Sequence, residues 1–165
     1  MAVGIDCLRG KICTRVREHY PENFTFEFGD ASLAVDCLWR IKVDGRVALT
    51  SYDHGQQFGL PAPLDAHAEA SSRLKDLRVV EVRLDEKSAD LILEFNGGLR
   101  LEVLTDSSGY EPWNLHAPGV HLVALGGRRN CRLLAAGLTN GLRRIFGPAR
   151  CARRSRPLSL ALALN

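Results

Sequence analysis

Two polar loops contain the residues that could carry out acid–base or nucleophilic chemistry. In the first loop, Asp53 could orient His54 as a general base, and in the second loop Ser107 or Ser108 could act as the nucleophile of a hydrolase. Side chains of adjacent residues usually point apart, and neither serine lies in the G-x-S-x-G turn that exposes a hydrolase nucleophile. The pattern therefore favours structural roles for these four residues and leaves a hydrolytic site as the alternative.

Residues 106–113 are the stronger candidate for a binding site, because acidic, polar and aromatic side chains crowd a turn between two strands. Tyrosine and tryptophan combine a flat apolar body with a polar tip, which suits them to hold a protein partner or a small ligand. Turn formation at Gly109 and burial of Trp113 would explain the same residue types without a binding role. The predicted binding surface combines this loop with the earlier one and contains Tyr110, Glu111, Trp113, Ser107, Ser108, Asp53 and His54.

His116 and His121 are expected to face each other across a hairpin, where they could share a metal ion. His54 or Glu111 would then have to supply a further ligand. Two histidines alone do not make a metal site, and on the wetter face of a hairpin they are ordinary polar residues. The sequence therefore predicts no metal ligands and no cofactor.

Charge is distributed unevenly along the 165-residue chain. No Asp or Glu follows Glu111, whereas nine arginines do, so residues 1–111 carry a net charge of −6 and residues 112–165 carry +9. Arginine clusters can bind the phosphates of nucleic acids or of acidic membranes. The tail lacks interleaved aromatic residues and nucleic-acid reading motifs, which argues against a nucleic-acid partner except through the tail itself.

The spacing of the five cysteines does not indicate a disulfide framework or a zinc knuckle, because their number is odd and no C-x-x-C pair occurs. Residues 1–11 lack the apolar core of a signal peptide, and no apolar run approaches the roughly 20 residues that cross a bilayer. We therefore expect a cytoplasmic protein with reduced thiols and no membrane partner. The sequence leaves its oligomeric state open.

Alternating apolar residues predict an α+β fold composed mainly of antiparallel β meanders. Two meanders are expected over Phe24–Ser51 and Val79–Thr105, with one central helix from Asp65 to about Leu77 between them. Asp65 is a good N-cap, and small alanines along the helix suggest close packing on a sheet. The segment 52–64 before the helix is rich in glycine and proline and is predicted to be a long loop.

Hairpin registers follow from asking which loop length places apolar residues on the same face of a sheet. The first meander is expected to turn through four residues, Gly29–Ser32, and then through a bulged loop of three residues, Val43–Gly45. The second meander is expected to turn through Asp85–Ser88 and through Asn96–Gly98. These loops predict the pairs Ile41 with Val47, Trp39 with Leu49, Val82 with Leu91, Val80 with Leu93, Leu93 with Leu101, Arg83 with Asp90 and Glu94 with Arg100.

Further elements are expected at both ends of the chain. A short edge strand is predicted near residues 12–16, and a last hairpin at Pro118-Gly119 is predicted to pair Leu115 with Leu122. Leucines from Leu134 onward fit a helix that ends before Gly147. The chain therefore divides into a single α+β domain over residues 1–127 and an arginine-rich C-terminal extension over residues 128–165, partly helical or disordered.

Two stretches of the sequence resemble small bacterial proteins that are grouped as a domain of unknown function. These are FNGGLRLEV through SSGYEPWNLHAPG, from Phe95 to Gly119, and DHGQQFGLPAPLDA, from Asp53 to Ala66. The likeness covers about residues 4–127, and its best motif is Gly109-Tyr110-Glu111 with Trp113. The family has no assigned activity, but similar short β-rich proteins occur as immunity or accessory proteins beside bacterial toxins.

Two classes of function follow from these observations. The favoured class is a non-catalytic protein-binding module of the immunity or accessory type, which presents an aromatic and acidic surface to a toxin-like or other protein partner. The alternative is a small hydrolase or small-ligand-binding protein with a site between residues 53–58 and 106–113. An exposed aromatic patch would favour the first class, and a concave site with convergent polar groups would favour the second.

Overall fold

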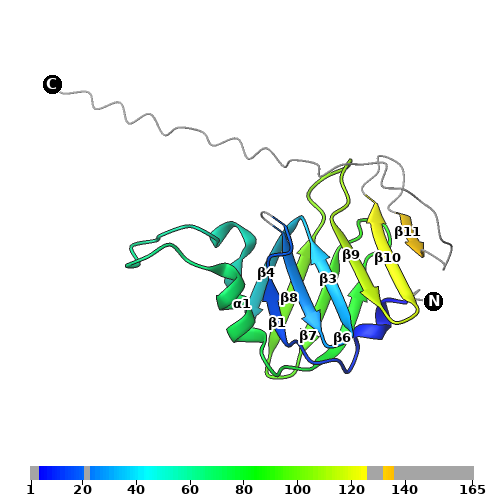
Figure 1. Ribbon diagram of the computed structural model, residues 1–165, viewed down its shortest axis with the longest axis horizontal. Coiled ribbons are helices and arrows are strands. Elements are labelled where there is room, and N and C mark those ends of the chain that lie inside the picture. Colours follow the sequence, from blue (N-terminus) through cyan, green and yellow to red (C-terminus); the bar gives the residue numbers. More distant parts are fainter. Residues whose placement is uncertain (1–3, 21–22, 126–131, 136–165) are drawn as a thin grey trace.

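Two antiparallel β-sheets packed face to face form most of this computed structural model, which describes residues 4–20, 23–125 and 132–135 (Figure 1). The six-stranded sheet has the order β1 (Arg15–Arg17), β2 (Phe24–Phe28), β3 (Ala31–Val35), β9 (Trp113–Ala117), β10 (Val120–Leu125) and β11 (Arg132–Ala135). The five-stranded sheet has the order β5 (Arg46–Thr50), β4 (Leu38–Val43), β8 (Leu99–Leu104), β7 (Leu91–Phe95) and β6 (Val79–Leu84). The described helices are α1 (Ala66–Leu74) and two short 3-10 helices, η1 (Ile5–Leu8) and η2 (Ser51–Asp53). The predicted α+β class, with antiparallel hairpins and one α-helix, is confirmed for these residues.

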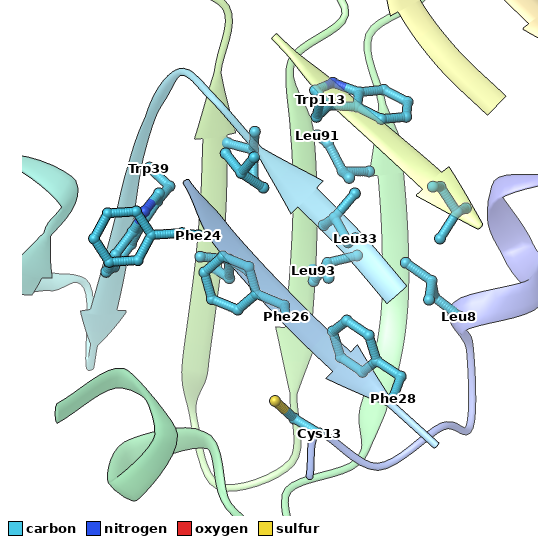
Figure 2. Packing of buried hydrophobic residues seen from close by; sticks show 14 of the residues in the cluster. Leu8, Cys13, Phe24, Phe26, Phe28, Leu33, Trp39, Leu91, Leu93 and Trp113 are labelled. Carbon is cyan, nitrogen blue, oxygen red and sulfur yellow. The ribbon is translucent and has the colours of Figure 1, made fainter. Parts of the chain in front are cut away.

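The core lies between the two sheets because alternate residues of each strand point inward. The three phenylalanines of β2 occupy this space and face residues of the other sheet, including Trp39 and Leu93 (Figure 2). The ring of Trp39 makes edge-to-face contacts with Phe24 and Phe26, with ring centroids 4.8 and 5.5 Å apart. Each fully buried side chain of this size contributes about 1.5–3 kcal/mol to folding.

The first predicted meander is divided between the two sheets, because the chain bends at Asp36 and Cys37. β3 ends at Val35 in the six-stranded sheet, and β4 begins at Leu38 in the five-stranded sheet. Val35, Cys37 and Trp39 are all buried, so the alternation of apolar residues continues through the bend. A second crossover, residues 105–112, returns the chain from β8 to β9.

The turn between β2 and β3 contains two residues rather than the predicted four. Gly29 has a φ of 72°, the left-handed conformation that glycine adopts readily at the first position of a tight hairpin turn. Phe26 therefore pairs with Leu33, and Phe28 pairs with Ala31. A shift of two residues preserves the inward face of each strand, so the predicted core residues are unaffected.

The turn between β4 and β5 also contains two residues, and the predicted bulge lies in the strand instead of the turn. Asp44 and Gly45 have φ values of 48° and 79°, as the favoured two-residue hairpin turn requires. Lys42 pairs with Val47 and Ile41 with Leu49, so the extra residue is in β5. The predicted pairs Ile41 with Val47 and Trp39 with Leu49 are therefore wrong, and Val47 is 54% exposed.

In the second group of strands, one predicted register is wrong and one is confirmed. The loop between β6 and β7 contains six residues, so Val82 pairs with Leu93 and Arg83 with Ile92. A bulge between Val79 and Glu81 leaves Val80 49% exposed, so its predicted pairing with Leu93 is also wrong. The predicted pairing of β7 with β8 is confirmed by Leu91 with Val103, Leu93 with Leu101 and Glu94 with Arg100.

The six-residue loop is held by Asp85, whose Oδ1 accepts hydrogen bonds from the backbone N–H groups of Lys87 and Ser88, at 2.8 and 3.4 Å. These backbone donors stabilise the charged carboxylate and hold the pKa of Asp85 below its ordinary value. The backbone N–H of Asp85 also donates to the carbonyl oxygen of Asp90, and the N–H of Ala89 donates to that of Asp85, at 2.9 and 2.8 Å. These backbone bonds close the loop at six residues instead of four.

The predicted helix is confirmed, although it ends earlier than expected. The carboxylate of Asp65 accepts hydrogen bonds from the backbone of His67 and Ala68, as an N-cap does. Ala66, Ala70 and Leu74 form the buried face, and α1 ends at Leu74 instead of Leu77. The helix packs beside β1, where the hydroxyl of Ser71 bonds both backbone groups of Val16 (Figure 1).

The ends of the described chain agree with the predictions in part. β1 is the predicted short strand at the edge of the six-stranded sheet, and the last hairpin pairs Leu115 with Leu122 as expected. Residues 132–135 form strand β11 beside β10, so the helix does not begin at Leu134. The rest of that predicted helix lies outside the described residues, and the domain boundary after residue 127 stays a prediction.

The outward face of the five-stranded sheet is organised around Glu102 on β8, which is only 4% exposed. Its carboxylate forms an ion pair with Arg40 and lies 3.3 Å from Nζ of Lys42 and 3.5 Å from a guanidinium nitrogen of Arg100. Burial alone would raise the pKa of Glu102, but the hydrogen bonds and charges of Arg40 and Lys42 outweigh burial and hold this pKa below its ordinary value.

We expect Glu102→Gln to lower the free energy of unfolding by about 1.5–3 kcal/mol near neutral pH, because hydrogen bonds to a charged acceptor are lost. A carboxylate with a depressed folded-state pKa stabilises the fold above its ordinary value of 4.5, and this contribution disappears as pH falls through the folded-state pKa. The difference between wild type and variant, measured by urea unfolding, should therefore shrink as pH falls below about 4.5. Glu94→Gln, on the same face but more exposed, is the control and should cost less than about 1 kcal/mol. A difference that persists unchanged at low pH would contradict this account.

Candidate functional site

Trp113 anchors the predicted binding loop in the core. Its side chain is fully buried, and its indole Nε1 donates a hydrogen bond to the carbonyl oxygen of Ala89, 2.7 Å away. Ala89 belongs to the loop between β6 and β7, so this bond connects the two sheets. Figure 2 shows the indole beside Leu91 at one end of the core. Trp113 therefore has a structural role and contributes no exposed surface to a binding site.

Two hydrogen bonds from backbone N–H groups attach the loop of residues 105–112 to the other crossover and to the start of β4. The carboxylate of Asp106 accepts a hydrogen bond from the N–H of Leu38 at 3.3 Å, and the carbonyl oxygen of Pro112 accepts one from the N–H of Asp36 at 2.9 Å. Ser107 accepts a bond from the N–H of Gly109 and so forms part of the turn. Both ends of the loop are thus fixed, with Tyr110 and its neighbours in between.

The exposed part of this loop contains Tyr110, 58% exposed, followed by Glu111. Tyr20, 41% exposed, lies near this loop, because its hydroxyl donates a hydrogen bond to the carboxylate of Asp36, whose N–H bonds Pro112 of the loop. Burial, the bond to Asp36 and the nearby charge of Glu111 all raise the pKa of Tyr20. We call these four residues, Tyr20, Asp36, Tyr110 and Glu111, the tyrosine–acid surface.

Tyr20 and Asp36 were not among the predicted site residues. Tyr20 lies in a polar segment with no alternating pattern, and Asp36 reads as one outward residue of a continuous strand. Their proximity results from the bend at Asp36 and from Asn23, whose side-chain N–H groups bond both the Asp36 carboxylate and the carbonyl oxygen of Val35. The polar residues 17–23, which directly precede the apolar strand that starts at Phe24, are the one sequence feature that could indicate this network.

The first polar loop does not form the hydrolytic arrangement. Asp53 accepts a hydrogen bond from the N–H of Thr50 at 2.8 Å and thereby caps η2, rather than orienting His54. Nδ1 of His54 instead accepts a hydrogen bond from the N–H of Ala66 at 3.1 Å. Because Ser107 is also bonded within its own turn, the described hydrogen bonds of these residues support local structure. Ser108 is exposed on the second loop.

His54 lies instead against His67, which is not among the predicted site residues. The ring centroid of His54 is 4.8 Å from that of His67, and Nδ1 of each histidine is within 4 Å of Oδ1 of Asp65. Among the described residues these three form the group of His, Cys, Asp or Glu side chains that could hold a metal ion. The contact depends on chain folding at the start of α1, which no sequence spacing reveals.

His116 and His121 pair across the last hairpin as predicted, with ring centroids 5.7 Å apart. Both are exposed, and within the described part of the chain they belong to no group of three metal-binding side chains. The described cysteines, Cys7, Cys13 and Cys37, are free thiols. Burial raises the pKa of Cys13 to about 12, so this thiol stays protonated and packs as a small apolar group.

An open hollow of about 610 Å³ lies beside the long loop. Residues 60–65 and three residues of α1, Ala68, Glu69 and Ser72, line it, so it does not lie between residues 53–58 and 106–113. Comparisons of the chain with protein-family models, curated protein sequences and solved structures gave no match. Within the described residues, no helix has the length and apolar character needed to cross a membrane.

The two buried tryptophans provide a matched test of the anchoring role of Trp113. Trp113→Phe leaves the buried carbonyl oxygen of Ala89 without its donor, whereas Trp39→Phe removes an indole N–H that has no partner among the described residues. The loss of volume is the same in both variants, because both side chains are fully buried. We therefore expect Trp113→Phe to be more destabilising by about 1–3 kcal/mol in thermal or urea unfolding. Equal destabilisation would show that the indole hydrogen bond is unimportant.

Proposed function

We propose that the protein is a non-catalytic protein-binding module, of the immunity or accessory type, that binds its partner through the tyrosine–acid surface. The observation that carries this proposal is an exposed tyrosine on a loop whose two ends are fixed. Tyr110 is 58% exposed, whereas Trp113, three residues later, is buried, and Asp106 is bonded to the N–H of Leu38 after the other crossover. A loop held in this way presents an aromatic side chain with little ordering cost on binding.

The chemistry of this surface indicates the kind of partner. Tyr20 bonds the carboxylate of Asp36 and lies near the charge of Glu111, which follows Tyr110 in the loop, and residues 1–111 carry a net charge of −6. Tyrosines provide apolar area with a hydrogen-bonding tip, and carboxylates select a positively charged surface and accelerate association with it. We therefore propose a protein partner with a basic contact surface, for which a toxin-like protein is the favoured class.

Several local contacts support a binding role over a hydrolytic one. In a catalytic Asp–His pair the histidine donates its Nδ1–H to the aspartate, yet the Nδ1 atom of His54 accepts the N–H of Ala66 and Asp53 caps η2. Tyr110, in contrast, is exposed on a fixed loop. Binding requires only such an exposed anchor with a polar rim.

The proposal predicts that Tyr110→Ala weakens binding by about 2 kcal/mol or more, which is about 30-fold in Kd, while the free energy of unfolding changes by less than about 0.5 kcal/mol. The partner would be captured from an extract of the native cells with the wild-type chain, identified by mass spectrometry and titrated calorimetrically. Phe58→Ala is the matched control, because Phe58 is also an exposed aromatic residue, 68% exposed, but lies on the long loop. Wild-type binding by both Tyr110→Ala and Glu111→Ala would refute the proposal.

Glu111→Gln separates the electrostatic contribution from the aromatic one. If Glu111 attracts a basic partner, the variant should associate more slowly, and the salt dependence of its association rate should be weaker than in wild type. Stopped-flow association at low and high ionic strength measures both effects. Asp85→Asn is the control, because Asp85 is an exposed carboxylate in another loop. Equal salt dependence in wild type and in Glu111→Gln would show that the carboxylate takes no part in association.

A further inference from the structure

We propose that His54, Asp65 and His67 form a binding site for a divalent first-row transition metal such as Zn²⁺. The site lies at the start of α1 and is distinct from the tyrosine–acid surface, so it does not depend on the proposed protein-binding function. One ligand atom from each residue lies within 4.8 Å of those of the other two. Two imidazoles and a carboxylate are ligands that zinc uses in proteins.

The ligand distances are close to those of a bound ion. Nδ1 of His54 lies 3.9 Å from Oδ1 of Asp65, and Nδ1 of His67 lies 3.7 Å from the same oxygen. In a tetrahedral zinc site with bonds of about 2.0–2.1 Å, neighbouring ligand atoms are about 3.3–3.5 Å apart. Movements of a few tenths of an ångström would therefore bring the carboxylate to the spacing required with either imidazole. The ligand atoms of the two imidazoles lie within 4.8 Å of each other, so the rings must also shift towards each other as the ion binds.

His67 has the orientation and tautomer that a metal ligand needs. Its Nε2 lies 3.0 Å from the carbonyl oxygen of Asn23, and because a carbonyl only accepts, this nitrogen carries the proton. Nδ1 therefore keeps its lone pair on the side that faces Asp65. The ring is stacked on Phe24, with centroids 4.0 Å apart and planes inclined by 10°. Histidines that bind metals usually donate the N–H of their other ring nitrogen to a carbonyl or carboxylate oxygen, as His67 does here.

The backbone holds His54 opposite Asp65 across the base of the long loop. The N–H of Gly55 donates to the carbonyl oxygen of Leu64, and the N–H of Leu64 donates to the carbonyl oxygen of Gln56, each at 2.8 Å. These bonds close the loop just inside the two ligands. A metal bound to both residues would therefore connect the two ends of the loop, and its ligands are already near each other before it binds.

Existing hydrogen bonds restrict how the ion binds. The Oδ1 atom of Asp65 that faces both histidines also caps α1, so a metal must share this oxygen with the cap or bind the second carboxylate oxygen of Asp65, whose side chain is 63% exposed. Nδ1 of His54 accepts from Ala66, so His54 must exchange this bond for the metal. The nitrogen-rich ligand set favours zinc, cobalt or nickel over calcium and magnesium, which prefer oxygen ligands.

Calorimetric titration of the full-length, tag-free chain with Zn²⁺ tests the site, after treatment with a chelator and alkylation of accessible thiols. We expect saturable Zn²⁺ binding. Loss of a residue that only supports a metal ligand typically weakens affinity about 10- to 100-fold, so loss of a ligand itself, in His54→Asn or in Asp65→Asn, should weaken it by more than that. Both variants preserve the fold, because asparagine keeps an acceptor for the N–H of Ala66 and is a good N-cap. His116→Asn is the control, because His116 and His121 form the other histidine pair. Absent binding, or binding that is unchanged in both variants, would overturn the proposal.

Proteolysis of the long loop provides a second readout that locates the ion. Chymotrypsin should cleave after Phe58, which is 68% exposed at the far part of the loop. Zn²⁺ should slow this cleavage in wild type but not in His54→Asn, because only the wild-type chain has both ends of the loop bound to the metal. Cleavage that Zn²⁺ leaves unchanged in wild type would overturn the proposal. Either result leaves the test of Tyr110 unaffected, so failure of this site and failure of the protein-binding function can be distinguished.

Discussion

The hydrogen bonds that join the two crossovers are the interaction on which the rest of the structure depends. The chain passes between the sheets at Asp36 and again at residues 105–112, and each passage interrupts the regular pairing of strands. The N–H groups of Asp36 and Leu38 are satisfied by Pro112 and Asp106 of the other passage. This mutual pairing aligns the two sheets, buries Trp113 between them and leaves Tyr110 outside.

The sequence predicts most of the buried residues, with the exposed Val47 and Val80 as exceptions, but not how the strands are connected. Side chains alternate between the two faces of a strand with a period of two residues, so a register error of two residues leaves every side chain on its predicted face. Phe24, Phe26 and Leu93 are therefore predicted in the core correctly although the predicted pairings of β2 with β3 and of β6 with β7 are wrong. Turn length depends on local chemistry, such as the left-handed Gly29 and the hydrogen bonds of Asp85. The bend at Asp36 escaped prediction because Val35, Cys37 and Trp39 keep the same alternation through it.

The candidate sites show the same division between local and long-range information. An exposed Tyr110 and a buried Trp113 agree with the roles expected from a turn next to a strand. Tyr20 reaches this surface through Asp36, and His67 reaches His54 through folding at the start of α1. Asn23 connects the two places, because its side chain bonds Asp36 and its carbonyl oxygen accepts from His67. The residues in these two contacts of Asn23 are separated by 13 and by 44 positions in the sequence, so spacing along the chain does not reveal them.

The bulges in β5 and β6 have a consequence for the behaviour of the protein at high concentration. These strands are the two edges of the five-stranded sheet, where unpaired N–H and C=O groups could template another chain. A bulge interrupts each edge: the extra residue between Val47 and Leu49 in β5, and Val80 in β6. In addition, residues 10–12 form backbone contacts with residues 78 and 79 at the start of β6. A bulged edge twists away from a flat partner strand, so the bulges that leave Val47 and Val80 exposed also protect the sheet against edge-to-edge aggregation.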